Sequence, residues 1–233
     1  MEYYKINRSY EPSIIGVNDA SAQVEIFTKP SKHSFENEKE RHYFIDYTDL
    51  NRKDTNRASI DNFISIDTSK ISIINVSKTK KRIKEVDIMY YMPRFIGFDV
   101  VFSKEILDEI EKYKLSDYNK VNIKVEGFDT LYYLIGFPMV DFPIIDFSII
   151  DFSKSTFYSD FYRKEIVFKD YEKYKNYNGL ADPKNIILKN KFDFDVLKTP
   201  FGIFFSERLV NDIEKRNFKA LEIDKNTTLL HVD

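Results

Sequence analysis

Three aspartates recur at a spacing of five residues, each followed by phenylalanine: Asp141, Asp146 and Asp151. Carboxylates that converge on one point can hold a magnesium ion, or act as acid and base in a nuclease or a glycosidase. A step of five changes face at every repeat in a strand and turns by about 140° in a helix, so successive carboxylates point apart. We therefore expect these residues to serve the fold. A metal-dependent enzyme that uses Asp146 and Asp151 is the alternative hypothesis.

The residues that other familiar sites require are scarce or badly spaced. The chain has no Cys, and its three imidazoles, His33, His42 and His231, form none of the usual metal-binding spacings. No two of the six Gly lie close enough for a phosphate-binding loop, and no Ser has Gly two residues away on both sides. The sequence thus predicts a protein that is not an enzyme and that uses neither a metal nor a cofactor.

Aromatic residues are abundant, because 21 Phe and 16 Tyr make up 16% of the chain, without a Trp. Phe residues at alternating strand positions are expected in the core. The Tyr-rich stretch from 157 to 177 shows no pattern that would assign it to the core. Tyr and Phe rings supply large contact areas at low entropic cost, which is typical of protein–protein interfaces. We therefore predict a partner surface in this region, with the following contact residues: Asp141, Tyr158, Asp160, Tyr162, Tyr171 and Tyr174.

The densest basic cluster lies between residues 78 and 84, and its members are Lys78, Lys80, Lys81, Arg82 and Lys84. No aromatic residue is interleaved with these cations, so a solvated loop is the favoured interpretation. The whole chain has 36 basic and 38 acidic side chains, a formal net charge of −2, and nucleic acid is not an expected partner. An RNA-binding antitoxin that uses the basic cluster is a further alternative.

Two segments share one plan: strand, serine, amphipathic helix, strand. Alternating apolar residues lead into Ser103 and Ser206, each at an N-cap position, and apolar residues at helical spacing follow. Apolar residues alternate again after each helix, which predicts a following strand. Residues 102–112 and 205–215 agree in type at nearly every position. Two well-capped surface helices and an internal duplication would both produce this likeness.

The remaining elements are less clearly marked. Residues 28–40 are polar and predict a loop or an exposed helix, and a second polar stretch covers 48–59. Short alternating runs at 64–66 and 71–73 predict two half-buried strands.

Length and composition predict the fold class. A chain of 233 residues with 42% hydrophobic and 32% charged residues is expected to be α+β, with a mixed sheet, at least two amphipathic helices and the two similar units. We expect residues 1–85 to form a strand and loop portion packed on a domain of residues 86–233. Acidic residues interrupt every long apolar run, and the first eight residues contain no signal-peptide core, so we expect a cytoplasmic protein without a membrane span.

Residues 205–209, Phe-Ser-Glu-Arg-Leu, enter a helix that is followed by a charged turn and a strand. This arrangement resembles the carboxyl-terminal signature of immunity proteins of bacterial polymorphic toxin systems, a group long catalogued as a domain of unknown function. Residues 151–157 are similar to the Asp-aromatic-x-x-Ser-x-Phe element of that group, with Phe152 in place of the usual Trp. The segments 102–104 (Phe-Ser-Lys) and 132–134 (Tyr-Tyr-Leu) complete the likeness, which covers about residues 86–230.

The resemblance implies a cytoplasmic, non-catalytic protein that binds and neutralises a cognate protein toxin delivered between competing bacteria. Immunity proteins diversify their binding surface with each toxin, so no contact residue is carried over from the group. The resemblance also implies that the Ser-Glu-Arg-Leu and Asp-Phe elements belong to the scaffold.

Overall fold

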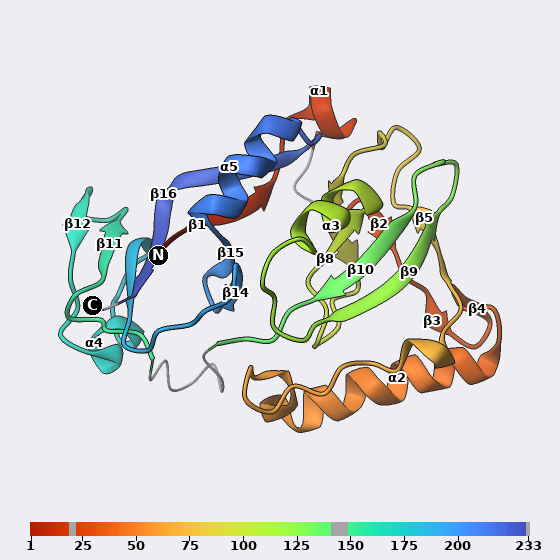
Figure 1. Cartoon of the computed structure of the whole chain (residues 1–233), viewed down its shortest axis with the longest axis horizontal. Helices are drawn as coiled ribbons and strands as arrows, with labels where there is room; N and C mark the ends of the chain where they lie inside the picture. Colours follow the sequence, from red (N-terminus) through yellow and green to blue (C-terminus); the bar gives the residue numbers. More distant parts are fainter. Residues whose placement is uncertain (19–21, 141–148, 232–233) are drawn as a thin grey trace.

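The computed structural model describes residues 1–18, 22–140 and 149–231. Within these ranges the chain forms two seven-stranded sheets and a two-stranded ribbon, with five α-helices around them (Figure 1). Both large sheets combine parallel with antiparallel strand pairs. The predicted α+β fold with a mixed sheet is therefore confirmed.

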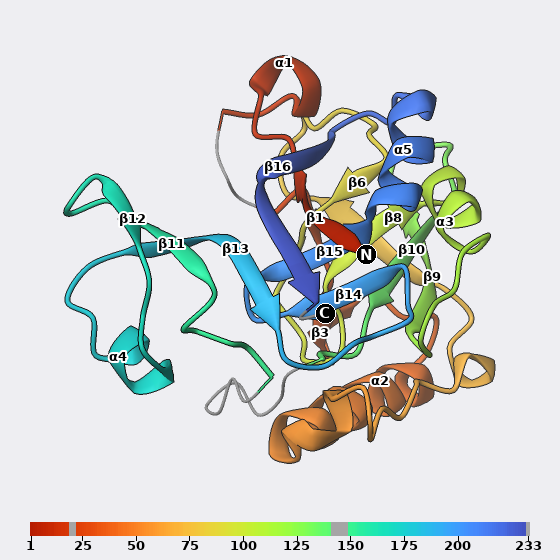
Figure 2. The ribbon, with the colours of Figure 1, turned by 60° about the vertical axis from the view of Figure 1, so that its left-hand side comes forward.

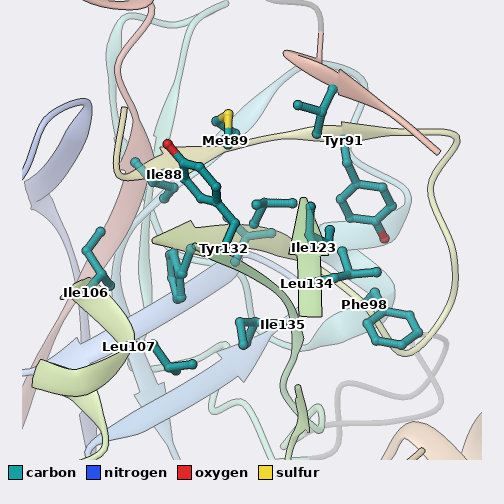
Figure 3. Close-up of a cluster of buried hydrophobic side chains, with 14 of the residues drawn as sticks. Ile88, Met89, Tyr91, Phe98, Ile106, Leu107, Ile123, Tyr132, Leu134 and Ile135 are labelled. Atoms are coloured by element: carbon teal, nitrogen blue, oxygen red, sulfur yellow. The ribbon is translucent and has the colours of Figure 1, made fainter. Parts of the chain in front are cut away.

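The first large sheet closes on itself, and we call it the closed sheet. Its strands follow one another as β6 (Ile88–Met89), β8 (Val100–Ser103), β10 (Tyr132–Gly136), β9 (Asn119–Val125), β5 (Ile74–Lys78), β2 (Val24–Glu25) and β7 (Tyr91–Met92). The first and last strands of this sheet, β6 and β7, are separated in the chain only by Tyr90. One continuous segment therefore forms both edges, which closes the sheet. Ile123, Tyr132 and Leu134 are fully buried in the cluster of apolar side chains that this sheet contributes to the core (Figure 3).

The second large sheet is open, and we call it the open sheet. Its strands follow as β12 (Lys164–Ile166), β11 (Thr156–Ser159), β13 (Ala181–Leu188), β16 (Leu221–His231), β1 (Glu2–Arg8), β15 (Gly202–Ser206) and β14 (Val196–Thr199). The amino-terminal strand β1 lies between two carboxyl-terminal strands and pairs antiparallel with both. Tyr3, Phe204 and Leu229 are fully buried in a second apolar cluster beneath this sheet.

Strands from both sides of residue 85 pair within each large sheet. β1 pairs with β15 and β16 in the open sheet, while β5 pairs with β9 and β2 pairs with β7 in the closed sheet. The expected division into 1–85 and 86–233 therefore does not coincide with the division between the two sheets.

The helices and small elements connect and cover the sheets. They are α1 (Pro12–Ile15), β3 (Thr28–Lys29), β4 (Lys32–His33), α2 (Glu38–Lys53), the 3-10 turns η1 (Thr55–Ala58) and η2 (Thr68–Lys70), α3 (Lys104–Ile110), α4 (Tyr171–Lys175) and α5 (Glu207–Arg216). Helix α2 spans parts of both polar stretches. Its N-cap Asn37 accepts hydrogen bonds from the amides of Lys39 and Glu40, and its Phe44 ring packs 5.4 Å from the Phe98 ring.

The strands predicted at 64–66 and 71–73 are wrong, since neither segment forms a strand. The Ile66 amide donates instead to the Asn119 side chain at 2.8 Å, and Ile71 follows the turn η2. Alternation in these short runs reflects partial burial in loops, because Ile66 and Ile71 are buried without strand partners.

Both predicted strand-serine-helix-strand units are present, and their serines cap the helices as expected. Ser103 Oγ accepts from the Ile106 amide and Ser206 Oγ accepts from the Leu209 amide, both at 3.4 Å. The strands that follow the two helices are β9 and β16. Short polar side chains at these positions satisfy amides that have no partner within the helix.

The two units also hold each other through matching aspartates. Asp87 accepts from Ser103 Oγ (2.8 Å) and from the Lys219 amide (2.7 Å) beyond the helix of the other unit. Asp195 likewise accepts from Ser206 Oγ (2.5 Å) and from the Lys114 amide (3.0 Å). Each aspartate therefore fixes the cap of its own unit and the turn after the opposite helix.

The helices α3 and α5 exchange a second pair of reciprocal contacts. Arg216 Nη2 lies 3.1 Å from Glu109 Oε2, and the Tyr113 hydroxyl donates to the Asp212 carboxylate. Because Glu109 corresponds to Asp212 and Tyr113 to Arg216 in the two units, the units pack with an approximate two-fold relation. This reciprocity favours the internal duplication over two unrelated capped helices.

Candidate functional site

The structure places the predicted acidic residues unevenly. Asp141 and Asp146 lie outside the described residues. The Asp151 carboxylate accepts from the Ser153 hydroxyl (2.6 Å) and amide (3.1 Å), and Lys154 lies 3.7 Å away. These contacts, led by the Ser153 hydroxyl, hold the pKa of Asp151 below its usual range. Asp151 is thus occupied within its own turn.

No group of three or more His, Asp or Glu residues in the described ranges is arranged to hold a metal ion. His33 and His42 instead lie near Glu38 at the start of α2, with Nε2–carboxylate distances of 3.2 and 3.8 Å. Their common neighbour is one surface carboxylate, which also binds Arg41.

The predicted basic cluster begins at Lys78, the last residue of β5, and continues through the loop before β6. Part of its charge faces the protein. Lys78 Nζ lies 5.0 Å from the centre of the Phe128 ring, and Lys84 Nζ donates to the Ser13 carbonyl at 2.8 Å. Lys81 and Arg82 are exposed. Lys78 and Lys84 thus hold this segment against neighbouring parts of the chain.

The Tyr-rich stretch forms an arm that extends away from the main body of the molecule (Figure 2). We define this arm as residues 156–180, which comprise β11, β12, α4 and their connections. β11 pairs with β13 on one side and β12 on the other, so the arm continues the edge of the open sheet. A projecting edge of this kind presents side chains to a partner from more than one side.

Large apolar side chains gather at the tip of the arm. Phe161 is 73% exposed, Leu180 is 70% exposed and Tyr162 is 57% exposed. Ser159 pairs with Ala181, which brings Leu180 across from the turn that carries the two aromatic residues. We call these three residues the tip cluster. Single exposed apolar side chains are common, whereas a contiguous group of them marks an interaction surface.

Local contacts order the tip. The Phe161 and Tyr162 rings meet edge to face with centroids 4.9 Å apart. The Tyr162 amide donates to Ser159 Oγ at 3.1 Å, and Ser159 also hydrogen-bonds the Tyr177 hydroxyl. Arg163 closes the turn with a φ of +50°. The exposed rings are therefore positioned before any partner arrives.

The base of the arm is an aromatic core. Tyr174 packs against Phe157, Phe152 and Phe168 with ring centroids 5.1, 5.2 and 5.4 Å apart, and Tyr171 lies 5.8 Å from Phe152. Burial raises the pKa of the Tyr174 hydroxyl. These rings stabilise the arm and carry the tip.

The predicted contact residues thus divide into separate groups. Tyr162 and Asp160 are exposed at the tip, and Tyr158 is half-buried beneath the side chain of Lys184. Tyr171 and Tyr174 lie in the base, and Asp141 lies outside the described residues. Two residues of the tip cluster, Phe161 and Leu180, are not among the predicted contact residues. An apolar residue beside a strand turn is the signal that could have found them.

Comparison with known proteins adds no relative: no family model matches the chain, and no curated protein is significantly similar to it. In the part of the chain that the structure describes, no helix is long and apolar enough to cross a lipid bilayer.

Proposed function

We propose that this protein is an immunity protein that binds and neutralises a cognate toxin of a contact-dependent or secreted polymorphic toxin system. Inhibition is by non-catalytic protein–protein contact, and its place of action is the cytoplasm. The observation that carries the proposal is the tip cluster, Phe161, Tyr162 and Leu180, exposed on a projecting arm.

The tip cluster has the properties of an interface centre. Aromatic residues dominate the binding energy of many interfaces, and a preorganised side chain loses little entropy on association. The edge-to-face contact and the Ser159 hydrogen bond supply that preorganisation. Asp160 adds a carboxylate beside the rings, which suits the polar rim around an apolar contact.

The apolar and serine positions of the segments that resemble the immunity group are buried, as scaffold positions would be, whereas Glu207 and Arg208 are exposed. Phe205 and Ser206 are fully buried at the start of α5, and Phe152 is buried in the base of the arm. Phe152 stacks on Phe157 and so supports the arm, whereas Phe205 and Ser206 lie at the entry to α5. The tip cluster contains none of the residues that carry the resemblance, so it is free to differ among related proteins.

The experiment begins with the gene immediately upstream, whose product is expected to carry a delivery domain and a toxic carboxyl-terminal end. Co-expression of this protein should rescue growth, and the two proteins should copurify. If an active toxin is in hand and neither result is obtained, the immunity function is refuted.

Variants of the tip then test the surface. Phe161→Ser combined with Tyr162→Ser should weaken toxin binding by at least about 30-fold, the effect of losing about 2 kcal/mol at an interface centre. The matched control is Leu50→Ser, since Leu50 is also exposed but lies on α2. If the tip variant binds the toxin with wild-type affinity and still rescues growth, the contact surface does not include the tip of the arm.

A further inference from the structure

A cleft of about 700 Å³ lies at the junction of the closed and open sheets. Its walls are strand β1 with Tyr10, the turn and strand at 198–203, and residues 90–100 of the closed sheet. The volume falls within the range of small-molecule sites, about 300–1,000 Å³. The tip cluster contributes no residue to this cleft.

One ion pair joins the two sheets in the cleft wall. Lys198 Nζ of β14 lies 2.6 Å from Asp99 Oδ1, and both side chains are largely buried. Asp99 Oδ2 also accepts from the Phe137 amide at 2.9 Å. Asp99 is the single carboxylate among the described residues that line the cleft, and Lys198 neutralises it.

Two further cations line the cleft, Lys5 and Arg94. Within the described ranges neither of them forms an ion pair. Together with Lys198 they leave the cleft with two positive charges in excess, although the whole chain has a formal net charge of −2. The alkyl chain of Lys5 lies against Gly202, where a Cβ atom would approach Lys5 Cε to 2.9 Å.

Aromatic rings stand beside these cations. Arg94 Cζ lies 5.8 Å from the centre of the Tyr90 ring. The buried Arg8 guanidinium holds Tyr90 and Tyr10 together, at 4.9 and 4.7 Å from their ring centres. The cleft therefore combines fixed aromatic walls with unpaired positive charge, and most of its remaining lining is apolar.

We propose that this cleft binds a small amphipathic organic anion, in which an apolar or aromatic body carries one sulfonate, carboxylate or phosphate group. Lys5 and Arg94 bind the anionic group, while Tyr10 and Tyr90 contact the body. Neither cation loses an internal partner when the ligand binds, so the charge interaction is not offset by breaking an ion pair. The partly enclosed, aromatic setting favours a ligand with an apolar body over a free inorganic ion.

The test uses two probes of nearly the same shape. 8-Anilinonaphthalene-1-sulfonate carries the anion, and N-phenyl-1-naphthylamine lacks it. Titration followed by probe fluorescence should show saturable binding of the sulfonate at one site, and binding of the neutral probe at least about tenfold weaker. Equal affinity for the two probes, or no sulfonate binding up to about 1 mM, would overturn the proposal.

Variants locate the site. Lys5→Gln and Arg94→Gln should each weaken sulfonate binding about threefold to tenfold, as removal of one charge-assisted contact does. Lys81→Gln removes an exposed cation outside the cleft, and Phe161→Ser removes an exposed ring at the tip, so both should bind as wild type does. Circular dichroism melts confirm that each variant is folded. Undiminished binding by a folded Lys5→Gln, Arg94→Gln double variant would refute the assignment.

Discussion

Asp195→Ala removes the acceptor at the centre of the contacts between the two repeated units. Asp195 is fully buried, and its two oxygens accept four hydrogen bonds. Ser206 and the Lys114 amide donate two of them, and the half-exposed Arg208 donates the other two at 2.5 and 2.6 Å. Without the carboxylate, the buried Ser206 hydroxyl and the Lys114 amide lose their charged partner.

The expected loss in the free energy of unfolding follows from two of these donors, Ser206 Oγ and the Lys114 amide. A hydrogen bond to a charged group contributes about 1.5–3 kcal/mol, and the lower figure applies because the Lys114 end is partly solvated. Two such bonds give a loss of about 3 kcal/mol in the free energy of unfolding. Arg208 adds little, since water replaces its lost contacts. For a chain of this length the loss corresponds to about 6–12 °C in Tm.

Urea unfolding followed by far-UV circular dichroism measures this loss. The matched control is Asp193→Ala, two residues away, whose exposed carboxylate contacts only the Lys114 ammonium group among the described residues. That variant should unfold as wild type does. If Asp195→Ala costs less than about 1 kcal/mol, or no more than the control, Asp195 does not hold the units together.

Three other predictions concern acid, packing and metal. Burial raises the pKa of Asp195, but the hydrogen bonds from Arg208 and Ser206 lower it by more, so the pKa of this carboxyl lies below its ordinary value. The resulting stability is present above the unfolded pKa of about 4 and is lost as the pH falls through the folded pKa, so acid should reduce the urea midpoint more in wild type than in Asp195→Asn. Gly136→Ala would place Cβ 1.7 Å from the Gly97 carbonyl oxygen, and calorimetry should show a loss of about 3 kcal/mol in the free energy of unfolding. Gly127→Ala should cost less, because its Cβ meets nothing closer than 3.5 Å and only the strain of the positive φ at Gly127 remains. Millimolar magnesium should leave the Tm unchanged, because the Asp151 carboxylate is occupied within its own turn; a rise that Asp151→Asn abolishes would support the metal-dependent enzyme instead.

Helix α2 shows where sequence patterning is insufficient. Residues 38–53 are mostly polar, and the buried side chains of this helix include Arg41 and Asn51. Arg41 Nη1 donates to the Thr28 carbonyl at 2.9 Å, and Asn51 accepts from Arg57. Polar side chains take part of the buried face of α2, where tertiary hydrogen bonds satisfy them. This helix therefore lacks the continuous apolar stripe that marks the two repeated helices, α3 and α5.

The candidate site was predicted in part for a similar reason. The composition indicated that the Tyr-rich stretch lies apart from the strand cores, and the stretch forms the arm. Ring counts alone do not separate a packed aromatic residue from an exposed one. Tyr174 and Tyr162 have the same side chain, and their different roles follow from their places in the arm, in the packed base and at the exposed tip.

Local residue patterns are enough to specify the two strand-serine-helix-strand units, because the cap of each helix is a hydrogen bond between residues three positions apart. Only the tertiary structure decided that β1 lies between β15 and β16, since the pairing of Tyr3 with Ser206 and Leu229 joins opposite ends of the chain. The cleft has the same origin, because β1, residues 90–100 and the turn and strand at 198–203 line it together although they are far apart in the sequence. No local pattern of residue types encodes which distant strands become neighbours.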